Sequence, residues 1–182
     1  MILNPRFLTL AGMILTAALS RVLPHPPNFT PLTAIALFGG AYFSDKRMAF
    51  LIPLAAMLLS DLVIGFHSQL IMVYLCFMIT VCIGFSLRSR KKLFPIGLAT
   101  AASSIIFFLV TNFGVWLFDQ LYPKTLNGLW TCYVAAIPFF RNTLLGDLFY
   151  VGILFGTFAL AEKTVPPLRE ASPLPSKEMN SY

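Results

Sequence analysis

Most residues of this sequence that could bind a small molecule occur in short polar groups between long apolar segments. Two acids, Asp61 and Asp147, interrupt segments that are otherwise apolar. Acids and amides can hydrogen-bond to the edge of a polar heteroaromatic ring, and tryptophans can stack on its face. The candidate solute-binding residues are Asn28, Thr30, Asp61, Asn112, Trp116, Trp130, Arg141, Asn142 and Asp147.

Asp61 and Asp147 carry the most weight, because they lie farthest inside apolar segments. An ionisable group at membrane depth costs roughly 2.5–3.5 kcal/mol, so it is usually paired or borders a polar cavity. Each acid would accept hydrogen bonds from a solute or hold Arg141 in place. The alternative is that the acids form structural ion pairs and that Trp116 and Trp130 belong to an ordinary interfacial aromatic belt.

The composition explains why a membrane must position these residues. Of the 182 residues, 58% are hydrophobic and 11% are charged, whereas about 25% of the residues in a soluble domain are charged. A soluble protein of this length cannot bury so much apolar surface. Backbone groups in lipid need internal partners, which leaves a helix bundle or a closed barrel. The apolar segments are continuous and do not alternate, so we expect an all-α membrane protein.

Charges, prolines and turn residues divide the chain into six apolar segments and predict a six-transmembrane-helix bundle. The segments are 7–23, 31–43, 48–65, 69–87, 93–118 and 134–161. The second is short, because crossing ~30 Å of hydrocarbon takes about 20 helical residues. It is either extended by 28–30, or tilted or broken and buried in the bundle. We expect one domain over residues 1–163 and a disordered cytoplasmic tail over 164–182.

Basic residues predict how the bundle is oriented. Ten of the thirteen lysines and arginines flank one set of segment ends, and only Lys124 lies in the opposite loops. The ten are Arg6, Lys46, Arg47, Arg88, Arg90, Lys91, Lys92, Lys163, Arg169 and Lys177. Because cytoplasmic loops carry an excess of Lys and Arg, both termini are predicted in the cytoplasm, an N-in/C-in arrangement in a bacterial inner membrane. The candidate solute-binding residues then gather toward the outer side.

The sequence contains no motif typical of catalysis or cofactor binding, such as a nucleophile elbow, a Walker loop, HExxH or a glycine-rich dinucleotide turn. Cys76, Cys82 and Cys132 have no metal-ligand spacing. We therefore expect no enzyme activity, no cofactor and no metal, although an enzyme acting on lipid or prenyl substrates stays an alternative. The basic residues lie beside apolar segments, so we expect no nucleic-acid partner.

A ridge of small residues, Gly12, Thr16 and Ser20, occurs at steps of four on the first segment. Small residues on one helix face let another helix approach closely. The ridge is therefore a candidate contact with a partner protein, and packing inside the bundle is an equally good interpretation.

Four stretches resemble a known family. They are residues 20–24 (SRVLP), 28–41 (NFTPLTAIALFGGA), 60–62 (SDL) and 142–147 (NTLLGD). Together with six spans in fewer than 200 residues, they are similar to the substrate-binding S components of energy-coupling factor vitamin transporters. The resemblance covers about residues 10–161, and is greatest to a group of small bacterial transport proteins in that superfamily.

This resemblance implies a solute pocket on the outer side, closed by the first loop and by the loop between the fifth and sixth segments. It also implies a transmembrane coupling subunit and two ATPases as partners. Many S components carry two alanines four apart on the first helix, whereas here Ala11 is followed four residues on by Leu15. The Met1-Ile2 start also departs from the Met-His start of cobalt and nickel S components and argues against a metal substrate.

The expected function is therefore binding and uptake of a small, vitamin- or nucleobase-like solute. The alternative is a non-transport membrane scaffold or assembly factor, in which the polar residues are structural.

Overall fold

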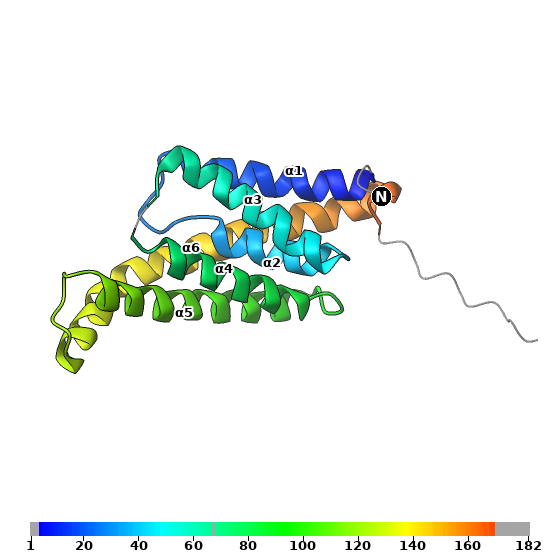
Figure 1. The fold of residues 1–182 in the computed structure, drawn as a ribbon. Coiled ribbons are helices and arrows are strands. Elements are labelled where there is room, and N and C mark those ends of the chain that lie inside the picture. The colour runs from blue at the N-terminus through cyan, green and yellow to red at the C-terminus, as the bar shows by residue number, and fades with distance from the viewer. Residues whose placement is uncertain (1–3, 67, 170–182) are drawn as a thin grey trace, which may run out of the picture.

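The computed structural model describes residues 4–66 and 68–169, which form six α-helices and two short 3₁₀ helices. The elements are α1 (Pro5–Leu19), η1 (Ser20–Val22), α2 (Leu32–Tyr42), α3 (Lys46–Ile64), α4 (Leu70–Phe85), α5 (Leu93–Phe118), α6 (Leu126–Thr164) and η2 (Pro166–Leu168). The prediction of an all-α fold with six helices is confirmed, and the fifth segment has the predicted bounds. Both ends of the described chain lie at one end of the bundle (Figure 1).

The bundle has two ends with different sequences. The start of α1, the end of α6 and the connections α2–α3 and α4–α5 form what we call the terminal end (Figure 1). The connections from η1 to α2, from α3 to α4 and from α5 to α6 form the loop end. Of the ten basic residues that predicted the orientation, nine belong to the described terminal end, and Lys177 lies outside the described residues.

Helix α6 begins at Leu126 and not at residue 134, so the prediction of a long outer loop is wrong. Thr125 caps the helix, because its hydroxyl oxygen accepts a hydrogen bond from the Gly128 backbone N–H (3.1 Å). Pro138 lies inside the helix. Trp130 therefore lies on a helix and not in a loop.

Helix α2 runs through the middle of the bundle, where it packs against the other five helices. It has 11 residues, so at ~1.5 Å per residue it is about 16 Å long, roughly half of the hydrocarbon thickness. Its side chains are buried from Thr33 to Tyr42. Of the two alternatives for this segment, a short helix buried in the bundle is the one that the structure supports. The Arg88 guanidinium donates to the carbonyl oxygens of Gly40 (3.0 Å) and Phe43 (2.7 Å) at the end of α2.

Two glycines allow α2 and α4 to pack closely. A Cβ atom on Gly40 would lie 2.3 Å from the Val81 carbonyl oxygen, and one on Gly84 would lie 2.6 Å from that of Leu37. On another side of α2, Phe38 contacts the ring of Phe155 at a centroid distance of 5.5 Å. Close contacts on both sides hold the short helix in place without a membrane-length span.

The outer surface of the bundle is apolar. Large hydrophobic side chains that are exposed on it include Leu59, Ile71, Leu98, Ile105, Leu109, Ile137, Leu145, Phe149 and Leu160. Helices α3, α5 and α6 are long and apolar enough to cross a membrane, and α2 and α4 are shorter apolar helices. By the composition of its helices, this is a multi-pass membrane protein.

The described chain ends packed against the start of α1. The Arg6 guanidinium makes an ion pair with Glu162 (2.5 Å) and donates to the carbonyl oxygen of Leu168 in η2. The Leu168 side chain is buried. The first residues of the predicted tail therefore pack on the bundle, and residues 170–182 of that tail lie outside the described residues.

Candidate functional site

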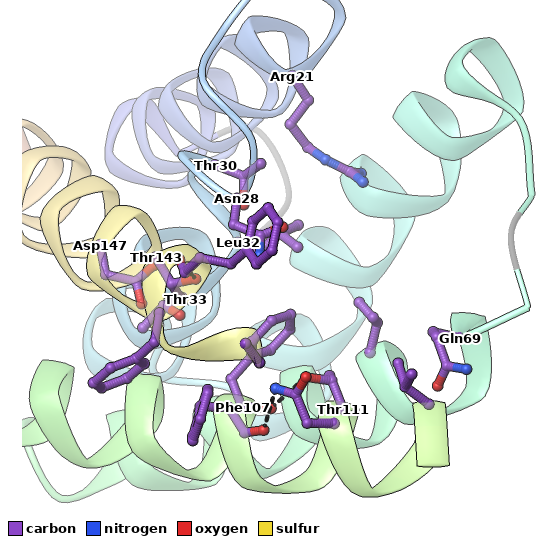
Figure 2. A pocket seen from close by; sticks show the side chains of 17 residues that line it. Arg21, Asn28, Thr30, Leu32, Thr33, Gln69, Phe107, Thr111, Thr143 and Asp147 are labelled. Carbon is purple, nitrogen blue, oxygen red and sulfur yellow. Dashed lines mark hydrogen bonds between the residues drawn. The ribbon is translucent and has the colours of Figure 1, made fainter. Parts of the chain in front are cut away.

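A cavity of about 330 Å³ lies at the loop end of the bundle (Figure 2). Six parts of the chain line it: η1, the loop before α2, and helices α2, α4, α5 and α6, with Gln69 at the cap of α4. Its lining residues are Arg21, Asn28, Thr30, Leu32, Thr33, Gln69, Val73, Phe107, Phe108, Thr111, Asn112, Val115, Ala136, Phe139, Phe140, Thr143 and Asp147.

The shortness of α2 explains where this cavity lies. Leu32 and Thr33, the first two residues of α2, line the cavity, and the preceding loop contributes Asn28 and Thr30. A helix of full membrane length would continue beyond Leu32 into this space. A loop with no regular structure covers this space instead. The interior at the loop end is therefore left open where a longer α2 would have filled it.

The loop that covers the cavity is attached to α6 at two points. The Asn142 side-chain amide donates to the Pro27 carbonyl oxygen (3.1 Å). Phe29 sits against Gly146, where an added Cβ atom would lie 3.0 Å from the Phe29 Cα. Between these points Asn28 adopts a φ of 62°, in the left-handed region that asparagine tolerates. The loop is therefore held across the cavity by backbone and side-chain contacts.

Asp147 is the acid that reaches the cavity. Its side chain lines the cavity and the residue is 2% exposed. The Ser104 hydroxyl of α5 donates to its carboxylate (2.6 Å), and Thr33 of α2 lies beside it (Figure 2). Within residues 4–66 and 68–169, the ion pairs are Arg6–Glu162 and Arg21–Asp61, so Asp147 has hydroxyl partners and no basic partner there.

Asp61 has a different environment. It is 1% exposed and makes an ion pair with Arg21, whose guanidinium nitrogen lies 2.7 Å from the carboxylate. The Tyr74 hydroxyl donates to its other oxygen (2.9 Å), and Arg21 also donates to the Ser60 hydroxyl. Arg21 lines the cavity and Asp61 does not. The cation that Asp61 holds is therefore Arg21, and not Arg141, which was one of the two partners expected.

The structure brings four of the nine candidate solute-binding residues to the cavity: Asn28, Thr30, Asn112 and Asp147. Asp61 lies behind Arg21, and Asn142 holds the covering loop. The remaining three do not line the cavity. The Trp116 indole N–H donates to the Pro123 carbonyl oxygen (2.9 Å), while Trp130 is 69% exposed and Arg141 is exposed.

The aromatic walls of the cavity come from phenylalanines and not from the tryptophans. Phe107 and Phe108 belong to α5, and Phe139 and Phe140 belong to α6. The rings of Phe108 and Phe140 contact each other at a centroid distance of 4.9 Å. A flat solute could pack against these rings.

Several polar lining residues escaped the sequence analysis. Thr143 lies four residues before Asp147, a spacing that puts both on one helix face and could have identified it. Gln69 gave no such signal, since it is a polar residue at the start of a helix. Its amide nitrogen donates to Asp119 (3.1 Å), while its carbonyl oxygen is buried without a hydrogen-bond partner among the described residues.

The ridge of Gly12, Thr16 and Ser20 lines a second hollow, which lies between α1 and α6. A Cβ atom on Gly12 would meet no atom within 4 Å. The Ser20 hydroxyl lies 3.3 Å from the Tyr150 hydroxyl of α6. The ridge therefore contacts α6 at Ser20 and leaves open space at Gly12.

Comparison with known proteins assigns the sequence to a family but does not identify its activity. Neither the curated proteins nor the solved structures give a significant match to the chain. Residues 1–169 match DUF6580, which is described as a family of unknown function. With almost its whole length matched, the chain belongs to the DUF6580 family.

Proposed function

We propose that this protein binds a small, vitamin- or nucleobase-like solute in the loop-end cavity and takes it up across the membrane. The observation that carries this proposal is the cavity, which combines phenylalanine walls with a buried acid that has no basic partner among the described residues. Its volume of about 330 Å³ falls within the roughly 300–1,000 Å³ of small-molecule sites. The protein acts as a binding subunit and not as an enzyme.

The direct test is native mass spectrometry of the purified protein. We expect a bound solute of about 100 to 500 Da, a range set by the size of such pockets. Ala136 lines the cavity, whereas its neighbour Ala135 is exposed on α6. Ala136→Phe should therefore remove the bound mass, and the matched control Ala135→Phe should keep it. Retention of the same mass by a folded Ala136→Phe variant would contradict binding in this cavity.

In this proposal the loop end faces outward and the basic terminal end faces the cytoplasm. The excess of lysine and arginine at the terminal end supports that orientation. Reporter fusions after Lys46 and Arg90 should then read cytoplasmic, and a fusion after Pro123 should read external. An external reading at Arg90 would overturn the N-in/C-in arrangement.

Uptake also needs an energy source, and we assign it to a separate transmembrane coupling subunit with two ATPases. The resemblance to S components supports this assignment, and the open space at Gly12 leaves room for a partner helix. Gly12→Leu should lower uptake more than it lowers solute binding. Gly97→Leu, at an equally open position on α5, is the control. Equal loss of binding and uptake in Gly12→Leu would assign the ridge to internal packing.

A non-transport scaffold is the second candidate, and one observation favours it. Both carboxylate oxygens of Asp61 are paired inside the protein, by Arg21 and Tyr74, and need no solute, although the Arg21 Nε is buried with no hydrogen-bond partner among the described residues. If every polar residue of the loop end were structural in this way, no solute would copurify and Ala136→Phe would change only stability.

A further inference from the structure

The charges around the cavity do not balance. Two charged side chains line it, Arg21 and Asp147. The Arg21 charge is neutralised by Asp61 at 2.7 Å, in a pair whose side chains are 8% and 1% exposed. Asp147 has no such counterpart in the part of the chain that the structure describes. The uncompensated group in the cavity wall is therefore a carboxyl.

The neighbours of Asp147 can hydrogen-bond to it but cannot neutralise it. Ser104 donates a hydroxyl proton, and Thr33 and Thr143 are also hydroxyl residues at the same end of the cavity (Figure 2). A carboxylate this far from water is costly unless an opposite charge accompanies it. The cavity wall supplies hydrogen bonds, so a solute can supply the charge.

A second acceptor lies at the opposite end of the cavity. Figure 2 shows Gln69 far from Asp147, with Phe107 and Thr111 between them. The Gln69 amide nitrogen is engaged by Asp119 (3.1 Å), and its carbonyl oxygen packs against Gly114 of α5, where an added Cβ atom would lie 2.5 Å from it. That oxygen is buried and has no partner within the described residues. An N–H group of a solute would satisfy it.

The rings between the two acceptors favour the same kind of solute. Phe107, Phe108 and Phe140 line the cavity, and Phe107 lies between the two acceptors (Figure 2). A cation is attracted to the face of an aromatic ring, and a flat group also packs well on it. Acceptors at both ends and aromatic faces between them complement a flat, positively charged molecule that carries N–H donors.

We infer that the solute is a flat nitrogen base bearing a positive charge, such as an amidine or a protonated amino-heterocycle. Its charged end binds Asp147, and an N–H group at its other end donates to Gln69. This inference rests on the proposed function, since it names the chemical class of solute for the same cavity. It excludes anionic solutes and ranks neutral amides below their charged isosteres.

Three probes of the same shape test the charge. Benzamidine is a flat cation, benzamide is its neutral counterpart and benzoate is the anion. Their affinities are measured by calorimetric titration of the full-length purified protein in detergent. Benzamidine should bind the wild type at least tenfold more tightly than benzamide, and benzoate should be the weakest of the three.

Substitution of the acid should remove the preference without removing binding. In Asp147→Asn, the affinities for benzamidine and benzamide should differ by less than threefold, and benzamide should bind about as it does to the wild type. Asp45→Asn makes the same chemical change at the N-cap of α3, at the terminal end, where Asn caps as well as Asp. That variant should keep the full preference for benzamidine.

The outcomes separate this inference from the function on which it rests. If benzamide or benzoate binds as tightly as benzamidine, and Ala136→Phe abolishes that binding, the cavity binds solutes but the charge assignment is wrong. If no probe binds the wild type, the charge assignment is also wrong. The proposed function would then be lost as well only if no solute copurifies in the native mass spectrum. A benzamidine preference that persists in Asp147→Asn would overturn the role of this acid.

Discussion

The regions around Asp61 and Asp147 contain equally buried acids and solve the same electrostatic problem differently. Asp61, on α3, is 1% exposed and Asp147, on α6, is 2% exposed. Asp61 makes an ion pair with Arg21 and accepts a hydrogen bond from Tyr74. Asp147 faces a cavity and receives a hydrogen bond from Ser104.

The difference shows that two equally buried acids can differ in whether they have a basic partner. Both acids have the same burial and interrupt the same kind of apolar segment. What separates them is whether the protein itself supplies the opposite charge. By that criterion we expect Asp61 to stabilise the loop end, and our proposal assigns Asp147 to the solute.

Removing the charge of Asp61 should have the largest effect on stability. Asp61→Asn keeps the size of the side chain but leaves the Arg21 guanidinium buried without a counterion. Breaking a buried pair by removing one partner costs about 3–5 kcal/mol. Thermal unfolding in detergent should show this loss. The double variant with Arg21→Met should recover part of it, and no recovery would mean that the two residues do not act as a pair.

A third carboxylate, Glu162, sharpens the comparison because its pair is more exposed. Glu162 makes an ion pair with Arg6 at the terminal end, and its side chain is 24% exposed. Arg6 would still donate to Leu168 and contact the Phe158 ring at 5.2 Å. Glu162→Gln should therefore lower the free energy of unfolding by about 1–2 kcal/mol, between the values for exposed and buried pairs. A loss as large as that of Asp61→Asn would show that exposure does not set the cost.

The smallest predicted effect is that of Thr143→Val on solute affinity. Thr143 lines the cavity one helical turn from Asp147, and its hydroxyl donates to the Phe139 carbonyl oxygen (3.1 Å). Thr143→Val keeps the shape and removes the hydroxyl that the proposal makes available to the solute, a hydrogen bond worth about 0.5–1.5 kcal/mol, so affinity should fall about two- to tenfold. Thr157→Val, on the exposed side of α6, is the control and should change nothing. An equal effect of both variants would place the hydroxyl's role in the helix and not in the cavity.

The helices were largely predictable, because apolar runs and their interruptions mark where the chain must be helical in lipid. The start of α6 was not, since the continuous apolar run begins at about residue 134, and the more polar turns from Leu126 onward are also helical. In a membrane helix an internal proline is tolerated, because neighbouring groups satisfy the freed backbone carbonyl. The polar cap at Thr125 then decides where the helix begins.

The site was only partly predictable, because pairing and helix rotation are properties of the packed bundle. The sequence identifies Asp61 and Asp147 as unusual, but Arg21 and Asp61 are 40 positions apart and their contact depends on how η1 and α3 pack. Rotation of α5 and α6 places Phe107 and Phe140 on the cavity and leaves the tryptophans outside it. Composition alone cannot supply that rotation.

The most direct test of the account is to measure solute retention and stability together in Asp147→Asn. Both quantities are compared with wild type and with the Asp45→Asn control, by native mass spectrometry and by thermal unfolding of the same preparations. The account predicts at least a tenfold loss of solute affinity, on the order of 1.4 kcal/mol, with an unfolding temperature of the solute-free protein near that of wild type. Unchanged solute retention together with a large loss of stability would contradict it, because Asp147 would then be a structural acid like Asp61.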